Sequence, residues 1–136
     1  FSIATHRGCY GECNFCAIGV HAGRQVRWRS PESILAEAER LTRHPEFKGY
    51  ISDLGGPTAN MYGIECRRKT LKGSCPEKRC LYPKVCPSLK PDHSRKMELL
   101  RRVREIGGIK KAFIGSGIRH DLLLSDKSTM FPGNSK

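Results

Sequence analysis

Three cysteines stand close together near the start of this 136-residue chain, in the run GCYGECNFCAI. Cys9, Cys13 and Cys16 follow a Cys-x3-Cys-x2-Cys spacing. Three thiolates in one short loop favour a metal centre, and iron–sulfur clusters are held by cysteine thiolates. Gly8 and Gly11 permit unusual backbone angles, because glycine enters positive φ without a steric penalty. The fold is therefore expected to place this loop around a metal site. If the metal centre is a [4Fe–4S] cube, three side-chain ligands leave one of its irons without a protein ligand.

A zinc knuckle is one alternative interpretation of these cysteines, and three buried thiols without a chemical role are another. Structural zinc sites almost always complete a tetrahedron of protein ligands. The nearest candidates for a fourth ligand are His6 and His21, and both stand at unusual spacings from the cysteines. The spacing therefore favours an iron–sulfur cluster over zinc.

With Phe15 directly before the last cysteine, the run resembles the cluster loop of the radical S-adenosylmethionine (SAM) superfamily. The resemblance implies that Cys9, Cys13 and Cys16 hold a [4Fe–4S] cluster whose fourth iron binds the amino and carboxylate groups of SAM. One electron then cleaves SAM to methionine and a 5′-deoxyadenosyl radical. A reductant and an unidentified substrate are the further implied partners. In such an enzyme the cofactor does the difficult chemistry and the protein positions it.

A strand, a helix and a second strand are predicted around this loop. The apolar run FSIAT at 1–5 is compatible with a strand that leads into the cluster loop. Ser30 and Pro31 are typical of a helix start, as N-cap and first helical residue, and the helix is expected to reach about Arg43. Its apolar stripe consists of Ile34, Leu35, Ala38 and Leu41. The run GYISDLGG then predicts a strand that ends at Gly55-Gly56.

A strand, helix and strand in this order make a parallel, right-handed unit, and ligands gather at the carboxyl ends of such strands. We therefore expect Cys9 and Gly55 to converge. In radical SAM proteins the glycines after the second strand contact the SAM amino group, in a motif commonly written GGE. The resemblance implies that Gly55 and Gly56 are SAM contacts and that Phe15 packs near the adenine. Pro57 stands where the motif has its acid, and an ordinary turn is the other interpretation of the glycine pair.

A second helix is predicted from about Ser94 to Ile106, before Gly107-Gly108. Its apolar stripe would comprise Met97, Leu100, Val103 and Ile106. The opposite face is basic and is either solvated or a phosphate-binding surface; it comprises Arg95, Lys96, Arg101, Arg102 and Arg104.

A third strand is predicted from Ala112 to Gly115, with a break at Ser116-Gly117 that forms another ligand-facing tip. Arg119 follows this tip, and its planar fork suits a carboxylate of SAM or of the substrate; a surface arginine is the alternative. HDLLL at 120–124 indicates the start of a further helix, and residues 128–136 are expected to be disordered or non-native.

A long insertion at 61–93 carries the other four cysteines. They are separated by eight, four and five residues, which is irregular for zinc, and they are Cys66, Cys75, Cys80 and Cys86. Four thiolates suit a zinc ion or a second iron–sulfur cluster with no open position. Reduced free cysteines are the alternative.

The insertion, together with the runs RSPESIL, SDLGGPTANMYG and GSGIRHD, narrows the resemblance to YgiQ-type radical SAM proteins, over Phe1 to about Lys127. These are larger proteins of uncharacterised reaction, which carry the cluster loop in a central partial barrel of parallel strands. The implied fold class is α/β, with about half of a (βα)6 partial barrel in residues 1–127. At 136 residues the chain is well short of the roughly 200 or more of a complete barrel, so we expect a fragment of a larger enzyme.

Charge and cysteine usage bear on partners and compartment. The net charge is +12, from 25 Lys and Arg against 13 Asp and Glu, which favours anionic partners. The main alternative function is therefore a non-catalytic zinc module that docks on nucleic acid through its basic loop. Seven cysteines cannot all pair, and metal ligation needs the reduced thiols of the cytoplasm. No run approaches the ~20 apolar residues of a membrane span, so we expect a soluble, cytoplasmic protein.

Overall fold

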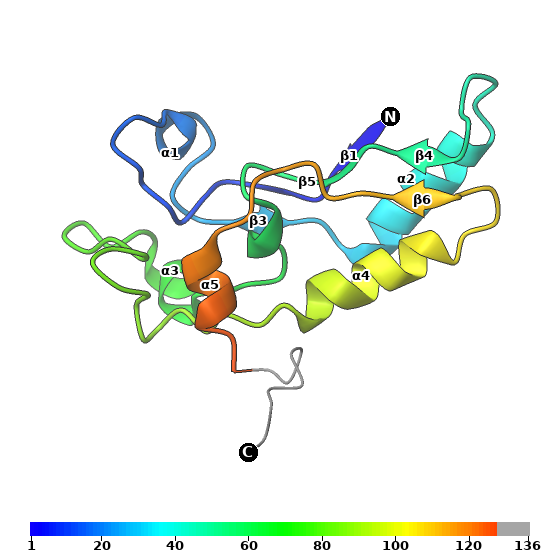
Figure 1. Cartoon of the computed structure of the whole chain (residues 1–136). Helices are drawn as coiled ribbons and strands as arrows, with labels where there is room; N and C mark the ends of the chain where they lie inside the picture. The colour runs from blue at the N-terminus through cyan, green and yellow to red at the C-terminus, as the bar shows by residue number, and fades with distance from the viewer. Residues whose placement is uncertain (128–136) are drawn as a thin grey trace, which may run out of the picture.

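The computed structural model describes residues 1–127, so the prediction for 128–136 lies outside the described residues. The order of elements is shown in Figure 1: β1 (Ser2–Ala4), β2 (His6–Arg7), α1 (Ile18–His21), β3 (Arg27–Trp28), α2 (Pro31–Thr42), β4 (Tyr50–Ile51), β5 (Asp53–Gly55), the 3-10 helix η1 (Ala59–Met61), α3 (Arg67–Lys72), α4 (Ser94–Arg104), β6 (Lys111–Ala112) and α5 (His120–Leu124). The fold is mixed α/β with short strands.

Two parallel strand pairs form the centre of the molecule. β1 pairs with β5, with Ile3 opposite Leu54, and β4 pairs with β6, with Ile51 opposite Ala112. The pairs are joined because the Phe113 N–H donates to the Ile51 carbonyl at 3.0 Å and the Leu54 N–H donates to the Phe113 carbonyl at 2.9 Å. The predicted parallel unit of strand, helix and strand is thus present in β1, α2 and β5. A partial radical SAM barrel stays a prediction.

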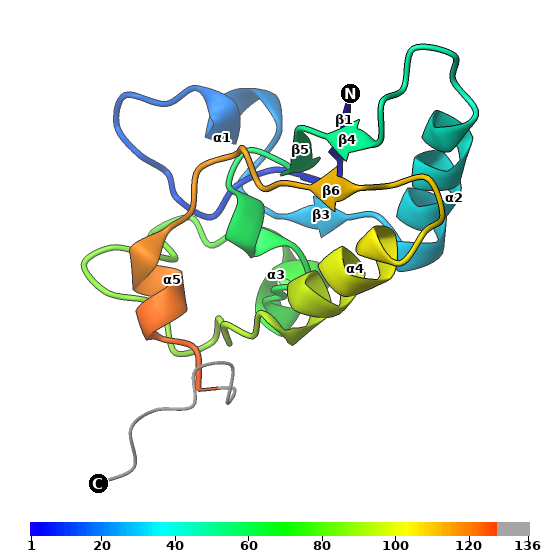
Figure 2. The ribbon, with the colours of Figure 1, turned by 45° about the vertical axis from the view of Figure 1, so that its right-hand side comes forward.

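The helices α2 and α4 lie together at one end of the molecule, whereas α1 and α5 lie at the other (Figures 1 and 2). The predicted cap of α2 is confirmed, because the Ser33 N–H donates to Ser30 Oγ at 3.2 Å and Pro31 is the first helical residue. The predicted stripe faces the main core, with Ile34 and Ala38 fully buried.

The predicted stripe of α4 is wrong at Met97, which is 46% exposed, and the prediction of Lys96 on the solvated face is wrong because Lys96 is only 3% exposed. The helix instead turns Leu99 into the core, together with the predicted Leu100 and Val103. Lys96 is buried because its ammonium donates to the Leu54 carbonyl and lies 5.8 Å from the centre of the Tyr62 ring, and such partners are not visible in a helical pattern. The helix ends at Arg104, two residues before the predicted Ile106.

The third predicted strand, 112–115, is observed at 111–112. It stops early because the N–H groups of Gly115 and Ser116 donate to the Asp53 carboxylate, at 2.9 and 3.1 Å, rather than to a neighbouring strand. The antiparallel pair of β2 and β3 and the short helices α1 and α3 were not predicted.

The insertion at 61–93 packs into a second core. Its buried side chains include Cys66, Cys80, Leu81 and Leu89. They pack against Tyr10 from residues 8–16, the loop of the first three cysteines, which is called the cluster loop below. The long loop is therefore packed against the cluster loop rather than separate from it. No helix within residues 1–127 is long and apolar enough to cross a bilayer.

His6 gives the fold a pH dependence. Its ring is 3% exposed and lies between Thr5 Oγ1, at 2.9 Å from Nδ1, and the Thr58 carbonyl, at 3.0 Å from Nε2. Burial, followed by the charge of Lys96, lowers the pKa of His6 from 6.5 to about 4. The unfolded chain therefore takes up a proton here at a higher pH than the folded chain, so this residue's contribution to stability is full above pH 6.5 and falls as the pH drops toward about 4.

We expect the free energy of unfolding to fall by up to about 3 kcal/mol across this window, since one pKa unit corresponds to about 1.4 kcal/mol. Replacing His6 by Gln should remove that dependence, because Gln does not titrate. Urea unfolding of both proteins at several pH values checks this. Parallel stability curves for the wild type and His6→Gln would contradict it.

Candidate metal centre

The loop that carries the first three cysteines has a backbone that few sequences can adopt. Gly8 has φ +81°, and a Cβ added there would lie 2.1 Å from the Gln25 carbonyl oxygen. The Cys9 N–H donates to the Gly23 carbonyl at 3.2 Å. Glu12, also at positive φ, pairs with Arg24 Nε at 2.8 Å. The loop is therefore held on both sides by residues 23–25.

Two of the three sulfurs border the same space beside Gly11. The Gly11 N–H donates to Cys9 Sγ at 3.3 Å. A Cβ on Gly11 would lie 3.3 Å from Cys9 Sγ and 3.5 Å from Cys13 Sγ, so both sulfurs lie close to this glycine. Cys16 follows in a turn closed by its N–H bond to the Cys13 carbonyl, at 3.0 Å. All three thiols are free and partly exposed.

Within residues 1–127, no group of three or more His, Cys, Asp or Glu side chains is already arranged to hold a metal ion. The donor set nevertheless fits an iron–sulfur cluster, because soft thiolates are the ligands that such clusters use. A Cβ on Gly11 would also lie 3.2 Å from Arg119 Nη1, so the glycine lets this cation and the two sulfurs approach the backbone closely.

The end of β5 converges on this loop. Thr58, two residues after Gly56, places its Oγ1 3.6 Å from Cys9 Sγ, and its carbonyl is bonded to His6. A Cβ on Gly56 would lie 2.6 Å from the His6 ring, and one on Gly55 would lie 2.3 Å from Ser116 Oγ. Both glycines therefore permit close packing in this structure, which is a role separate from the predicted contact with SAM.

Ser116 lies at the tip of the third parallel strand, as predicted, and its hydroxyl donates to the Asp53 carboxylate. Burial favours the neutral form of Asp53, but the hydrogen bonds from Ser116 and Gly115 outweigh it and lower the pKa of this carboxyl. Asp53 was not predicted as a site residue. The only signal for it in the sequence is an acid inside the otherwise apolar second strand.

Arg119 lies against the cluster loop, with Nη1 3.5 Å from Cys13 Sγ. Its other nitrogens bind Asp121 in a bidentate pair, at 3.0 and 2.6 Å. Asn60 fixes its backbone from both sides, through bonds of 2.9 Å to the Arg119 N–H and carbonyl. The hydrogen bonds that Arg119 donates to Asp121 raise the pKa of Arg119, so the guanidinium stays charged next to the thiol. Sequence reasoning found Arg119 but missed both of its partners.

A groove of about 500 Å³ runs beside Cys13 and Arg119. Its wall on the cluster loop includes Gly11, and its opposite wall comes from the insertion, with Arg79, Leu81 and Tyr82. Phe15 does not line this groove and is 93% exposed.

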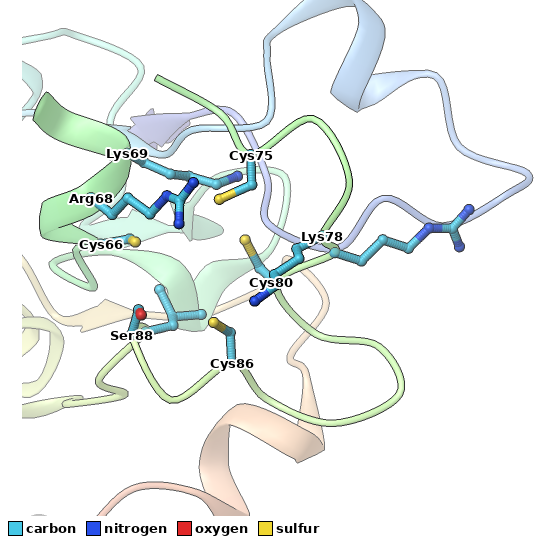
Figure 3. A pocket seen from close by; sticks show the side chains of 10 residues that line it. Cys66, Arg68, Lys69, Cys75, Lys78, Cys80, Cys86 and Ser88 are labelled. Atoms are coloured by element: carbon cyan, nitrogen blue, oxygen red, sulfur yellow. The ribbon is translucent and has the colours of Figure 1, made fainter. Parts of the chain in front are cut away.

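The structure also brings the four later cysteines together. Cys66, Cys75, Cys80 and Cys86 line one hollow of about 50 Å³ (Figure 3). This hollow is separate from the place beside Gly11 where the sulfurs of Cys9 and Cys13 lie.

No family model matches the chain. Curated relatives match nearly all of it: a UPF0313 protein of Fusobacterium nucleatum is 55% identical over 126 residues, which are 93% of this chain and 22% of that protein. One from Methanosarcina mazei is 55% identical over 127 residues, 93% of this chain and 20% of the relative. One from Clostridium perfringens is 50% identical over 131 residues, 96% of this chain and 20% of the relative.

The chain is similar to one segment of UPF0313 proteins. It spans about a fifth of the length of these relatives. The name UPF0313 states no reaction or cofactor, so any activity has to be argued from the residues of the site.

Proposed function

We propose that the chain is the cluster-binding segment of a YgiQ-type radical SAM enzyme, in which Cys9, Cys13 and Cys16 hold a [4Fe–4S] cluster. The observation that carries the proposal is the Cys-x3-Cys-x2-Cys run, in which the sulfurs of Cys9 and Cys13 lie beside the bare Gly11. Three side-chain ligands leave one iron free for SAM. When bound, the cluster supplies the electron that SAM cleavage requires.

The residues around the thiols are suited to this task. Cysteine thiols must lose their protons to bind a metal. The Arg119 guanidinium lies 3.5 Å from Cys13 Sγ, so a positive charge stands beside one of the proposed ligands. The Gly11 N–H donates to Cys9 Sγ. Hydrogen bonds and charges at the sulfurs set the reduction potential of a cluster. The three cysteines would therefore hold the cluster, and Arg119 and Gly11 would adjust its reduction potential.

The groove beside Cys13 is the proposed SAM site. Its volume, about 500 Å³, lies in the usual range for small-molecule pockets. Arg79 and Arg119 offer cations for the SAM carboxylate, and Tyr82, 70% exposed, offers an aromatic face for the adenine. Phe15, in the loop of the first three cysteines, is also exposed but does not line this groove.

The arrangement of the strands supports the proposed partial barrel. Three chain segments follow one another in the sequence and run parallel, namely β1, the segment of β4 and β5, and β6. This is the order expected for the first half of a fold that repeats strand and helix. The relatives are several times longer than this chain. We propose that the remaining strands and the substrate site belong to other segments of such a protein.

Reductive cleavage of SAM tests the proposal. Iron-loaded protein, prepared without oxygen and mixed with dithionite and SAM, is expected to release 5′-deoxyadenosine, measured by mass spectrometry. Arg119→Lys should weaken SAM binding about tenfold, equivalent to ~1.4 kcal/mol, because Lys lacks the fork that holds both Asp121 and Cys13. Arg101→Lys, on the exposed face of α4, is the matched control.

Two results would contradict the proposal. The first is iron-loaded protein that neither binds SAM in equilibrium dialysis nor cleaves it. The second is zinc rather than iron at Cys9, Cys13 and Cys16, combined with salt-sensitive binding of nucleic acid, which would favour the non-catalytic module.

A further inference from the structure

Four cysteines of the insertion surround one small hollow. Figure 3 shows the sulfurs of Cys66, Cys75, Cys80 and Cys86 pointing toward the same space, although Cys66 directly precedes α3 and the other three come from the loop that follows it. Cys66 and Cys80 are each only 6% exposed, and all four are free thiols. Four thiols that line one hollow from separate turns are candidates to share one ligand.

Hydrogen bonds fix the backbone at each of these cysteines. The Cys86 N–H donates to the Cys80 carbonyl at 2.8 Å, and the Leu89 N–H donates to the Cys86 carbonyl at 2.9 Å. The Cys66 carbonyl accepts from the Thr70 N–H at 3.1 Å. The Cys75 carbonyl accepts from Arg24 Nη2 at 2.5 Å. The four positions are thus held before any ligand binds.

The lining of the hollow is strongly basic. Its cations are Arg68, Lys69, Lys78 and Arg79, and Lys69 is only 1% exposed. Four thiolates around a divalent ion carry a net charge of −2, and a nearby cation lowers the free energy of such a centre. The four cations that line the hollow would balance the negative charge of thiolates bound to a metal ion.

We propose that Cys66, Cys75, Cys80 and Cys86 bind a single zinc ion. Four cysteine thiolates complete the tetrahedron of a structural zinc site and leave no open position. The hollow encloses about 50 Å³, and a single ion takes up less of it than a cube of eight atoms would. The site contracts on binding, because zinc–sulfur bonds are about 2.3 Å long and the thiols are not yet arranged to hold an ion.

The zinc site would stabilise the cluster loop. Arg24 binds the Cys75 carbonyl and also pairs with Glu12 of that loop. Lys69, from the zinc-site lining, donates to the Arg24 carbonyl and lies 5.4 Å from the centre of the Tyr10 ring. The ion would therefore hold the turns of the insertion in contact, through Arg24 and Lys69, with residues 9–16.

Metal analysis of the purified 136-residue chain tests this. We expect about one zinc per chain in the wild type and in Cys9→Ser/Cys13→Ser, and less than about a tenth of that in Cys75→Ser/Cys86→Ser. The first double variant is the matched control, because it removes two thiols from the same chain without touching the hollow. It also separates this proposal from that of the iron–sulfur cluster, which depends on other cysteines.

Cys75→His distinguishes the loss of a zinc ligand from a failure to fold, because three cysteines and one histidine also form zinc sites. It should keep its zinc, whereas Cys75→Ala should lose most of it. In the wild type, zinc should protect Cys66, Cys75, Cys80 and Cys86 from alkylation until a chelator is added, as read by mass spectrometry. The proposal is overturned by iron at these cysteines, by disulfides between them, or by their rapid alkylation in zinc-containing buffer.

Discussion

The triple variant Cys9→Ala/Cys13→Ala/Cys16→Ala is expected to lose all of the roughly four irons per chain that the reconstituted wild type should bind. The brown colour and the inorganic sulfide should disappear with them. The reason is that these three thiols are the proposed ligands, and the other four cysteines line a separate hollow. Iron and sulfide assays with an optical spectrum, all under nitrogen, measure the effect.

The fold of this variant should be kept, because the three thiols are only partly buried and belong to neither central strand pair. Its far-ultraviolet circular dichroism should match that of the wild type, and its zinc should remain on Cys66, Cys75, Cys80 and Cys86. Iron retained at the wild-type level in the variant would show that the cluster lies elsewhere.

Replacing Gly8 by Ala should lower the free energy of unfolding by more than about 3 kcal/mol. Two effects combine: the residue has φ +81°, and its new Cβ would stand 2.1 Å from the Gln25 carbonyl oxygen. The backbone of the cluster loop would have to move, so we also expect iron loading to fail. Urea unfolding and iron content of Gly8→Ala measure both effects.

Gly23 is the matched control for this substitution. It has a similar φ, +87°, but a Cβ there would meet no atom within 4 Å. Gly23→Ala should therefore lower stability by only about 1–2 kcal/mol, the cost of the left-handed conformation alone. Equal losses in the two variants would mean that the contact with Gln25 does not restrain the loop.

The elements with regular patterns could be predicted from the sequence. The cap and stripe of α2 and the parallel partner of β1 follow from local signals, namely Ser30-Pro31 and short apolar runs. Lys96 shows where this reasoning fails. A lysine on a helix is usually solvated, and its burial here depends on the Leu54 carbonyl and the Tyr62 ring, which come from distant parts of the chain.

The candidate site could be predicted in part. The spacing of Cys9, Cys13 and Cys16 indicates a cluster loop without any structure, because local spacing sets which thiols share a ligand. The partners of Arg119 could not be foreseen, since Asn60 reaches it across 59 positions of sequence. The sequence predicted a shared metal site or free thiols for the four later cysteines, and its irregular spacing could not decide between them, because turns and not a repeated motif bring them together.

Electron paramagnetic resonance of the reduced, iron-loaded protein, with and without SAM, is the most direct test of a cluster with one open iron. We predict that SAM changes the signal of the reduced cluster in the wild type, because its amino and carboxylate groups bind the iron that Cys9, Cys13 and Cys16 leave free. A cluster signal that saturating SAM leaves unchanged would contradict the account.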